Sequence, residues 1–217
     1  MIDIKSVTVT ELATNCYVVT DKATGDCAVI DPGELSPELD KTLSVIGYDK
    51  IRYILLTHGH YDHIGGTDAV LSKTGGKAEV AIGESDVPML GDSFSNLSKF
   101  FSSSPLDSLK CNIALHDGDK ITLGESVFNV IETPGHTKGS VCFICEDSIF
   151  SGDTLFYRSH GRTDFPTGSN MEMASSLKKL AALKGNYTVY PGHNITTTLE
   201  AERKYNPYIG SNYDNIY

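Results

Sequence analysis

Several side chains that can bind metal ions are crowded into one short segment, residues 57–63, with the sequence THGHYDH. The segment follows an apolar run over 51–56, which has the length of a buried strand, and precedes a helix predicted over 64–73. A histidine-rich turn can arise by chance, but four ligands on one glycine-containing loop favour metal binding. The four candidate ligands are His58, His60, Asp62 and His63.

Three later residues add to this set, and each follows a strand-like run in a turn marked by Gly or Pro. They are His136 in the turn Thr-Pro-Gly-His, Asp153 in Ser-Gly-Asp-Thr, and His193 in Pro-Gly-His. Taken separately, each could be an ordinary turn residue. Together with the first four they make seven potential ligands, which is enough for two metal ions.

The pattern along the chain predicts an α/β fold. Short strands are expected over 6–10, 16–20, 27–31, 51–56 and 79–82, with helices over 36–47, 64–73 and from Glu84. A serine-rich stretch over 91–110 is expected to be a surface loop or lid. Strands return over 113–151, followed by a helix over 171–183, a strand over 187–190 and a helix over 197–205. Two β-rich halves, each followed by helices, predict a four-layer αββα sandwich of two mixed sheets in a single domain, 1–217.

Composition narrows the partners and the compartment. The chain has 217 residues and a formal net charge of -10, with no run of Lys or Arg, which disfavours nucleic acid and anionic membranes as partners. No apolar run is long enough to span a bilayer, and the N-terminus lacks the pattern of a signal peptide. Five cysteines, an odd number, are expected to be buried free thiols in a reducing cytoplasm. Cys142 and Cys145 have CxxC spacing, but on a strand they point to opposite faces, which favours a structural role.

The HxHxDH motif, followed in chain order by single His, Asp and His ligands, resembles the metallo-β-lactamase superfamily. The resemblance extends over nearly the whole chain and also implies the αββα fold. It implies that one metal is held by His58, His60 and His136, and the other by Asp62, His63 and His193, with Asp153 bridging the two. The expected cofactors are two divalent ions, zinc foremost, with iron or manganese as alternatives.

The chemistry expected of such a site is hydrolysis by a hydroxide bound between two metals, since each cation lowers the pKa of a shared water. A carbonyl lying against one metal would be polarised, and no protein nucleophile would be required. Asp62 and Asp153 would serve catalysis as ionised metal ligands rather than as simple general bases.

Residues 152–156 and 161–168, GDTLF and GRTDFPTG, resemble the short glyoxalase II-like hydrolases, which act on thioesters such as S-lactoylglutathione. The resemblance implies that Arg162 helps hold the thiol portion of a small acyl-thiol substrate; alternatively, Arg162 pairs with Asp164. His160 is a further candidate for substrate contact, whereas His116 is expected at the surface. In the commonest zinc β-lactamases a cysteine ligand stands at the position of Asp153, which argues against antibiotic hydrolysis.

Two other reactions of the superfamily remain open. Persulfide dioxygenases share very similar motifs but bind one iron, here through His58, His136 and Asp153. Lactone hydrolysis would use the same two-metal chemistry on a cyclic ester. The chain also ends soon after His193, without the extra helical region of full-length glyoxalase II, so a thiol other than glutathione is expected to be a candidate as well. The oligomeric state does not follow from the sequence.

Overall fold

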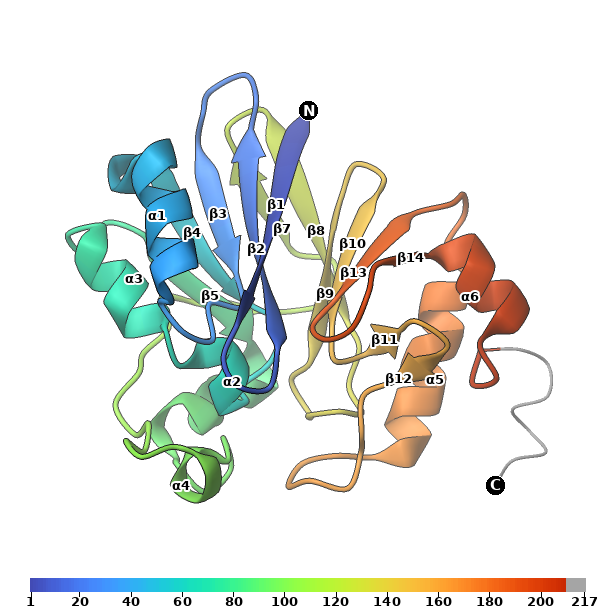
Figure 1. Ribbon diagram of the computed structural model, residues 1–217. Helices are drawn as coiled ribbons and strands as arrows, with labels where there is room; N and C mark the ends of the chain where they lie inside the picture. The colour runs from blue at the N-terminus through green and yellow to red at the C-terminus, as the bar shows by residue number, and fades with distance from the viewer. Residues whose placement is uncertain (210–217) are drawn as a thin grey trace.

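Two six-stranded sheets face each other in the computed structural model, which describes residues 1–209 (Figure 1). The first sheet has the order β1-β2-β3-β4-β5-β6 and is built from β1 (Ile2–Val9), β2 (Thr14–Asp21), β3 (Cys27–Ile30), β4 (Ile51–Leu56), β5 (Glu79–Gly83) and β6 (Ile113–Leu115). The second has the order β14-β13-β10-β9-β8-β7 and is built from β7 (Lys120–Leu123), β8 (Ser126–Glu132), β9 (Val141–Cys145), β10 (Ser148–Gly152), β13 (Thr188–Pro191) and β14 (Thr197–Thr198). A short hairpin, β11 (Leu155–Phe156) with β12 (Ser159–His160), forms a separate two-stranded sheet.

Both sheets are mixed, and strand direction determines what gathers at their edges. In the first sheet β3, β4, β5 and β6 are parallel neighbours. In the second sheet β10 and β13 are parallel, and β8 points the same way because both β8 and β10 pair antiparallel to β9. The carboxyl ends of parallel strands lie at one edge of a sheet, which is where ligands bind in open α/β sheets. Every predicted metal ligand follows one of these strands.

Helices cover the outer face of each sheet (Figure 1). On the first sheet lie α1 (Pro37–Ile46) and α3 (Thr67–Lys73), and on the second lie α5 (Asn170–Ala181) and α6 (Leu199–Tyr205). The start of α1 follows from its sequence, because the hydroxyl of Ser36 accepts from the Leu39 amide and Pro37 stands at the first helical position. The shorter helices are α2 (Tyr61–Ile64), α4 (Ser98–Phe101), and the 3-10 helices η1 (Tyr48–Lys50) and η2 (Glu84–Gly91).

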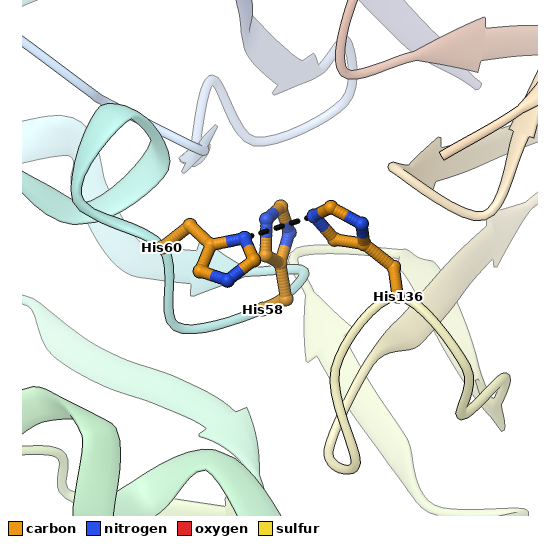
Figure 2. A group of neighbouring side chains, drawn as sticks. All are labelled: His58, His60 and His136. Carbon is orange, nitrogen blue, oxygen red and sulfur yellow. Dashed lines mark hydrogen bonds between the residues drawn. The ribbon is translucent and has the colours of Figure 1, made fainter. Parts of the chain in front are cut away.

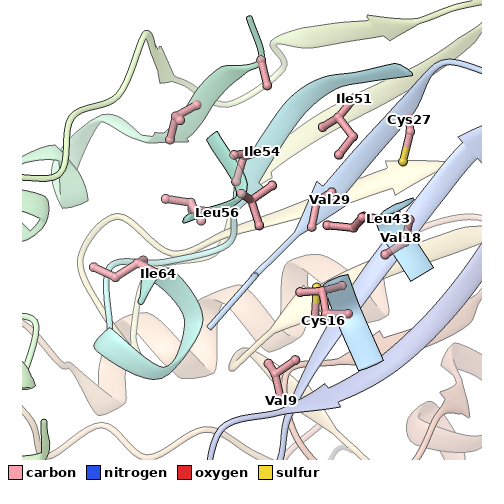
Figure 3. Packing of buried hydrophobic residues seen from close by; sticks show 14 of the residues in the cluster. Val9, Cys16, Val18, Cys27, Val29, Leu43, Ile51, Ile54, Leu56 and Ile64 are labelled. Atoms are coloured by element: carbon pink, nitrogen blue, oxygen red, sulfur yellow. The ribbon is translucent and has the colours of Figure 1, made fainter. Parts of the chain in front are cut away.

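Three hydrophobic clusters fill the spaces between these layers. One lies between the first sheet and its helices and includes Val29, Ile54, Leu56 and Leu43 (Figure 3). A second joins the two sheets, and a third joins the second sheet to α5 and α6. The predicted four-layer αββα sandwich of two mixed sheets is therefore confirmed. The predicted single domain, 1–217, includes residues 210–217, which lie outside the described part of the chain.

The sequence-based boundaries were wrong around the histidine segment. The sequence predicts one helix over 64–73. In the structure α2 begins at Tyr61, and Gly65 and Gly66 separate it from α3. A Cβ on Gly66 would lie 2.5 Å from the Pro32 carbonyl oxygen, and one on Gly65 would lie 2.6 Å from that of Gly33. This close approach of two backbones requires glycine and interrupts the helix.

Three further segments differ from the sequence-based expectation. The segment from Glu84 is a 3-10 helix with Pro88 inside it, and the stretch over 91–110 contains the one-turn helix α4. The hairpin of β11 and β12 was not predicted, because each of its strands is only two residues long.

No helix in the described residues is long and apolar enough to cross a membrane.

The cysteines behave as expected of structural residues. All five are free thiols, and four of them are buried. On β9, Cys142 joins the outer cluster with α5, whereas Cys145 joins the cluster between the sheets. The two side chains therefore point to opposite faces, which excludes a shared redox or metal role for the CxxC pair in this fold.

We expect Phe150→Ala to lower the free energy of unfolding by about 3–5 kcal/mol, because a buried aromatic ring leaves a cavity when removed. Phe150 is fully buried between the sheets, with its ring centroid 5.3 Å from that of Tyr190 and 5.5 Å from that of Tyr17. Urea unfolding would measure the change. The matched control is Val45→Ala, since Val45 is 74% exposed on α1 and should shift stability little. Equal effects of the two variants would show that the space between the sheets is not the core.

Candidate metal centre

Three histidine rings converge at the edge where the strands of both sheets end (Figure 2). His58 and His60 follow β4 in the first sheet, and His136 lies in the loop after β8 in the second. The Nδ1 atom of His60 lies 2.8 Å from Nε2 of His136, and the ring of His58 lies 4.7 Å from that of His136. One ligand atom from each of the three residues lies within 4.8 Å of the others, so this group could hold a metal ion.

A second group lies beside the first and has the same property. Asp62 and His63 lie on α2, and His193 follows β13. The Nε2 atom of His193 is 3.3 Å from Oδ2 of Asp62 and 3.3 Å from Nε2 of His63. Because α2 starts at Tyr61, the second pair of ligands in the HxHxDH motif is presented by a helical turn rather than by a loop.

The carboxylate of Asp153, at the end of β10, lies between the two groups. Its Oδ2 atom is 3.4 Å from Nε2 of His136 in the first group, and its Oδ1 atom is 3.5 Å from Nε2 of His63 in the second. Asp153 also forms a third candidate ligand group with His58 and His63. The fold thus brings together all seven residues that the sequence nominated as ligands.

The hydrogen bonds behind two histidines fix which nitrogen faces the centre. Nδ1 of His136 lies 2.6 Å from the Arg162 carbonyl oxygen, and Nδ1 of His193 lies 3.2 Å from that of Leu12. A carbonyl oxygen can only accept, so Nδ1 carries the proton in both rings. Nε2 is then the atom that each ring turns toward the centre, where His136 faces His60 and His193 faces Asp62.

Asp31 sets the orientation of two more rings. It accepts from Nδ1 of His63 at 3.0 Å and from the hydroxyl of Thr57 at 2.6 Å. Because Thr57 uses its proton on Asp31, its oxygen is free to accept from Nδ1 of His58, 3.1 Å away. Both rings therefore turn Nε2 toward the centre, and a carboxylate supports His63 directly, as in many histidine-metal sites.

Unpartnered polar atoms test whether this set fits metal ions. Nε2 of His58, Nε2 of His60 and Oδ1 of Asp153 are buried without a hydrogen-bond partner in the described structure. Leaving such atoms unpaired is costly unless something else binds them. A Cβ on Gly192 would lie 2.3 Å from Asp153 Oδ1 and 2.7 Å from His63 Cε1, so glycine keeps this space open. The histidine and aspartate cluster is suited to two divalent cations.

The pKa shifts of the site residues also support the binding of cations. Burial lowers the pKa of His58 and of His60 well below the usual value, so both rings are neutral. Burial also lowers the pKa of His63, but the carboxylates of Asp62, Asp153 and Asp31 outweigh it and raise this pKa to about 10. Burial would raise the pKa of Asp62, yet His63 and His193 hold it well below its usual value. Carboxylates gathered in a buried site require positive charge, which bound cations supply.

Two supporting carboxylates were missed from the sequence. Besides Asp31, the buried Asp86 accepts from the amides of Gly59 at 2.9 Å and Gly139 at 2.7 Å, and from the hydroxyl of Thr137 at 2.6 Å. Asp86 thereby ties the loop carrying His58 and His60 to the loop carrying His136. The available signal was position, since Asp31 and Asp86 follow β3 and β5, the strands on either side of β4.

A cavity of about 400 Å³ opens onto this centre, and we call it the site pocket. His60, Asp62, His136, Asp153 and His193 form its polar floor. Its walls are largely apolar and consist of Leu12, Tyr61, Leu97, Phe101, Phe156 and Phe165. Among the described lining residues there is no Ser, Thr, Cys or Lys side chain. A protein nucleophile of those kinds is therefore not available in the pocket.

The two predicted substrate contacts have different surroundings. Arg162 lines the site pocket, but its Nε and Nη2 atoms each donate to the carboxylate of Asp164 at 2.7 Å. Of the two alternatives for Arg162, the pairing with Asp164 is therefore the one seen. His160 is absent from the described lining of the pocket, and its Nδ1 donates to the Gly161 carbonyl at 2.7 Å. His116 is exposed, as expected, and lies 3.6 Å from Glu84.

We expect Asp31→Asn to weaken zinc binding at the group of Asp62, His63 and His193 by about 10–100-fold, the usual effect of losing a carboxylate behind a histidine ligand. Asparagine keeps the shape and tolerates the positive φ of +52° at this position. Calorimetric titration of metal-free protein would measure the zinc affinity. Asp26→Asn is the control, because Asp26 is a partly exposed residue that pairs with Arg52. An unchanged zinc affinity would contradict the supporting role of Asp31.

The sequence matches the family model described as the metallo-beta-lactamase superfamily over residues 9–193. Among curated proteins, the chain is 30% identical over 213 residues to the hydroxyacylglutathione hydrolase GloC of Haemophilus influenzae, covering 96% of this chain and 99% of that one. The predicted resemblance is thus confirmed at the level of the family.

Solved structures agree with the sequence match. The crystal structure of the BLEG-1 B3 metallo-beta-lactamase superposes with a TM-score of 0.84 at 30% identity, covering 95% of this chain and 99% of that one. TTHA1623 in a di-iron-bound form gives a TM-score of 0.82 at 30% identity, covering 94% and 99%. Together with the family model, these matches show that the chain belongs to the metallo-beta-lactamase superfamily of metal-dependent hydrolases.

Proposed function

We propose that the protein is a two-metal hydrolase that cleaves a thioester, such as S-lactoylglutathione or a related acyl-thiol. The observation that carries the proposal is the position of Asp153, whose two carboxylate oxygens face the two ligand groups at 3.4 Å and 3.5 Å. His58, His60 and His136 would hold one metal, and Asp62, His63 and His193 the other. Zinc fits these nitrogen and oxygen donors, and iron or manganese would also be accepted.

When bound, two such cations lower the pKa of water and polarise a carbonyl oxygen. The chain's own residues supply the rest. His63 and His193 keep Asp62 ionised, and the carbonyl oxygens behind His136 and His193 orient these rings with Nε2 toward the centre. The apolar walls of the site pocket exclude water from all but the reacting end of a bound substrate.

Several observations support a thioester as the substrate. GloC of Haemophilus influenzae, which is named a hydroxyacylglutathione hydrolase, aligns along nearly its whole length. The segments 152–156 and 161–168 carry the motifs that resemble glyoxalase II-like hydrolases. The proposal also places the protein in the reducing cytoplasm, which its five free cysteines favour, and gives it a small-molecule partner rather than nucleic acid or a membrane.

The competing activities use different metals or bonds. A mononuclear iron dioxygenase acting on persulfides would need only His58, His136 and Asp153, and the complete second group of Asp62, His63 and His193 favours the two-metal hydrolase. Lactone or β-lactam hydrolysis would use the same centre. Metal analysis, with parallel assays on thioesters, a lactone, a chromogenic cephalosporin and a persulfide, separates these activities. Two metals with thioester cleavage support the proposal, whereas one iron with persulfide-dependent oxygen uptake overturns it.

We expect Asp153→Ala to lower bound metal and thioester turnover by orders of magnitude, because both ligand groups lose the carboxylate between them. Metal content per chain and kcat/KM would be measured together on folded protein. The Asp26→Ala variant, altered at a partly exposed position where Asp26 pairs with Arg52, serves as the control. Full turnover by a metal-loaded Asp153→Ala variant would contradict the bridging role.

A further inference from the structure

The apolar residues that form the walls of the site pocket are not needed to bind metal ions, so they can select the substrate. Leu97 is 6% exposed and adopts a left-handed backbone with φ of +68°, which disfavours residues with a Cβ. Such strain persists only where the surrounding structure imposes it. Here the neighbours impose it, because Asn96 donates its side-chain amide to the carbonyls of Met89 and Leu106, both at 2.8 Å. The fold therefore holds the apolar side chain of Leu97 against the pocket in a backbone conformation that is unfavourable for leucine.

Phe101 extends this wall. It is 57% exposed, yet it lines the pocket and stacks on Tyr61 with the ring centroids 6.0 Å apart and an interplanar angle of 14°. The amide of Tyr61 donates to the Asn96 carbonyl at 2.9 Å, so the wall is attached to the segment that carries Asp62 and His63. An exposed phenylalanine at the mouth of a pocket is uncovered apolar surface that a ligand can bury.

The opposite side of the pocket is also apolar. Phe165 lies edge-on to His60 at 5.8 Å, and Phe156 lies edge-on to His193 at 6.1 Å. Leu12 completes the rim, and its carbonyl oxygen accepts from His193. Each ligand group thus has an aromatic ring beside it.

The described pocket lining offers little unpaired positive charge to bind an anionic substrate tail. Arg162 is the cation of that lining, and both of its donor contacts go to Asp164. Its guanidinium carbon lies over the ring of Phe165, 3.8 Å from the ring centroid. Arg162 is therefore already paired with a carboxylate, and a carboxylate of a glutathione tail would have to share the guanidinium with Asp164.

From this lining we propose that the substrate is a thioester with an apolar acyl group, such as a medium-length alkyl or an arylacetyl chain, and with a thiol that need carry no charge. The inference rests on the proposed function and names its substrate class. Cleavage forms a carbon-oxygen bond to water, breaks the carbon-sulfur bond, and passes a proton to the departing thiolate. The apolar acyl chain lies against Leu97 and Phe101, with the carbonyl toward Asp153.

The test uses metal-loaded full-length protein and thioesters of one neutral thiol, N-acetylcysteamine, carrying acetyl, lactoyl, butanoyl, hexanoyl or phenylacetyl groups. Each buried methylene favours binding by about fourfold, and hexanoyl has four more methylenes than acetyl. Burial of two to four of them should raise kcat/KM for hexanoyl over that for acetyl by about 16-fold to 250-fold. Replacing N-acetylcysteamine by glutathione should change kcat/KM by no more than about fivefold, as expected when an exposed cation is already paired.

Variants of the pocket wall test which residues cause the preference for a longer acyl chain. Phe101→Ala should lower the hexanoyl-to-acetyl ratio of kcat/KM by about tenfold, since it removes apolar contact area. Phe100→Ala is the matched control, because Phe100 is next in the chain and 56% exposed but lies outside the pocket lining. Leu97→Asn should also lower the ratio while suiting the left-handed backbone, so that loss of fold is not the cause.

The outcomes separate the two proposals. Equal kcat/KM across the acyl series, a preference for lactoyl, or a large gain from glutathione would overturn the apolar substrate while leaving thioester hydrolysis in place. Failure of the metal-loaded protein to cleave any member of the series would overturn the proposed function, and the substrate class with it.

Discussion

The metal centre depends on gathering carboxylates and imidazole rings in a buried place. Three carboxylates, from Asp31, Asp62 and Asp153, surround His63, at distances from 3.0 Å to 3.5 Å. In water such groups would separate, and burying them without compensating charge is unfavourable. Strand ends from two sheets and the turn of α2 hold them together, so the stability of the surrounding sandwich keeps the cluster assembled. Divalent cations are the partners that such a cluster suits.

Parallel strands explain why supporting residues lie where they do. β3, β4 and β5 end side by side and deliver Asp31, His58 and Asp86 to one edge. The middle strand supplies ligands, and its neighbours supply carboxylates that orient them or fix their loops. The second sheet contributes His136, Asp153 and His193 from three strands that run in one direction. The metal centre therefore forms where the two sheets meet, and each sheet supplies part of both ligand groups.

The local sequence pattern predicted the layers and named the seven side chains that the fold brings together. Continuous apolar runs indicated the buried strands, and turns ending in His or Asp indicated the seven candidate ligands, because ligand chemistry restricts residue type. The break between α2 and α3 could not be predicted, since it results from contact of Gly65 and Gly66 with residues 32–35 across the fold. The role of Asp86 could not be predicted, because acidic residues are common at the start of a helix and only the fold places Asp86 against Gly59 and Gly139. The sequence left two alternatives for Arg162, because only the folded turn shows that its Nε and Nη2 atoms both donate to Asp164.

The central claim is that this cluster holds two metal ions with Asp153 between them. Crystals of zinc-loaded protein, measured at the zinc absorption edge, test it most directly. We predict two anomalous peaks, one amid His58, His60 and His136 and the other amid Asp62, His63 and His193, with the Asp153 carboxylate contacting both. A single peak bound by His58, His136 and Asp153, with the second group free of metal, would contradict the account.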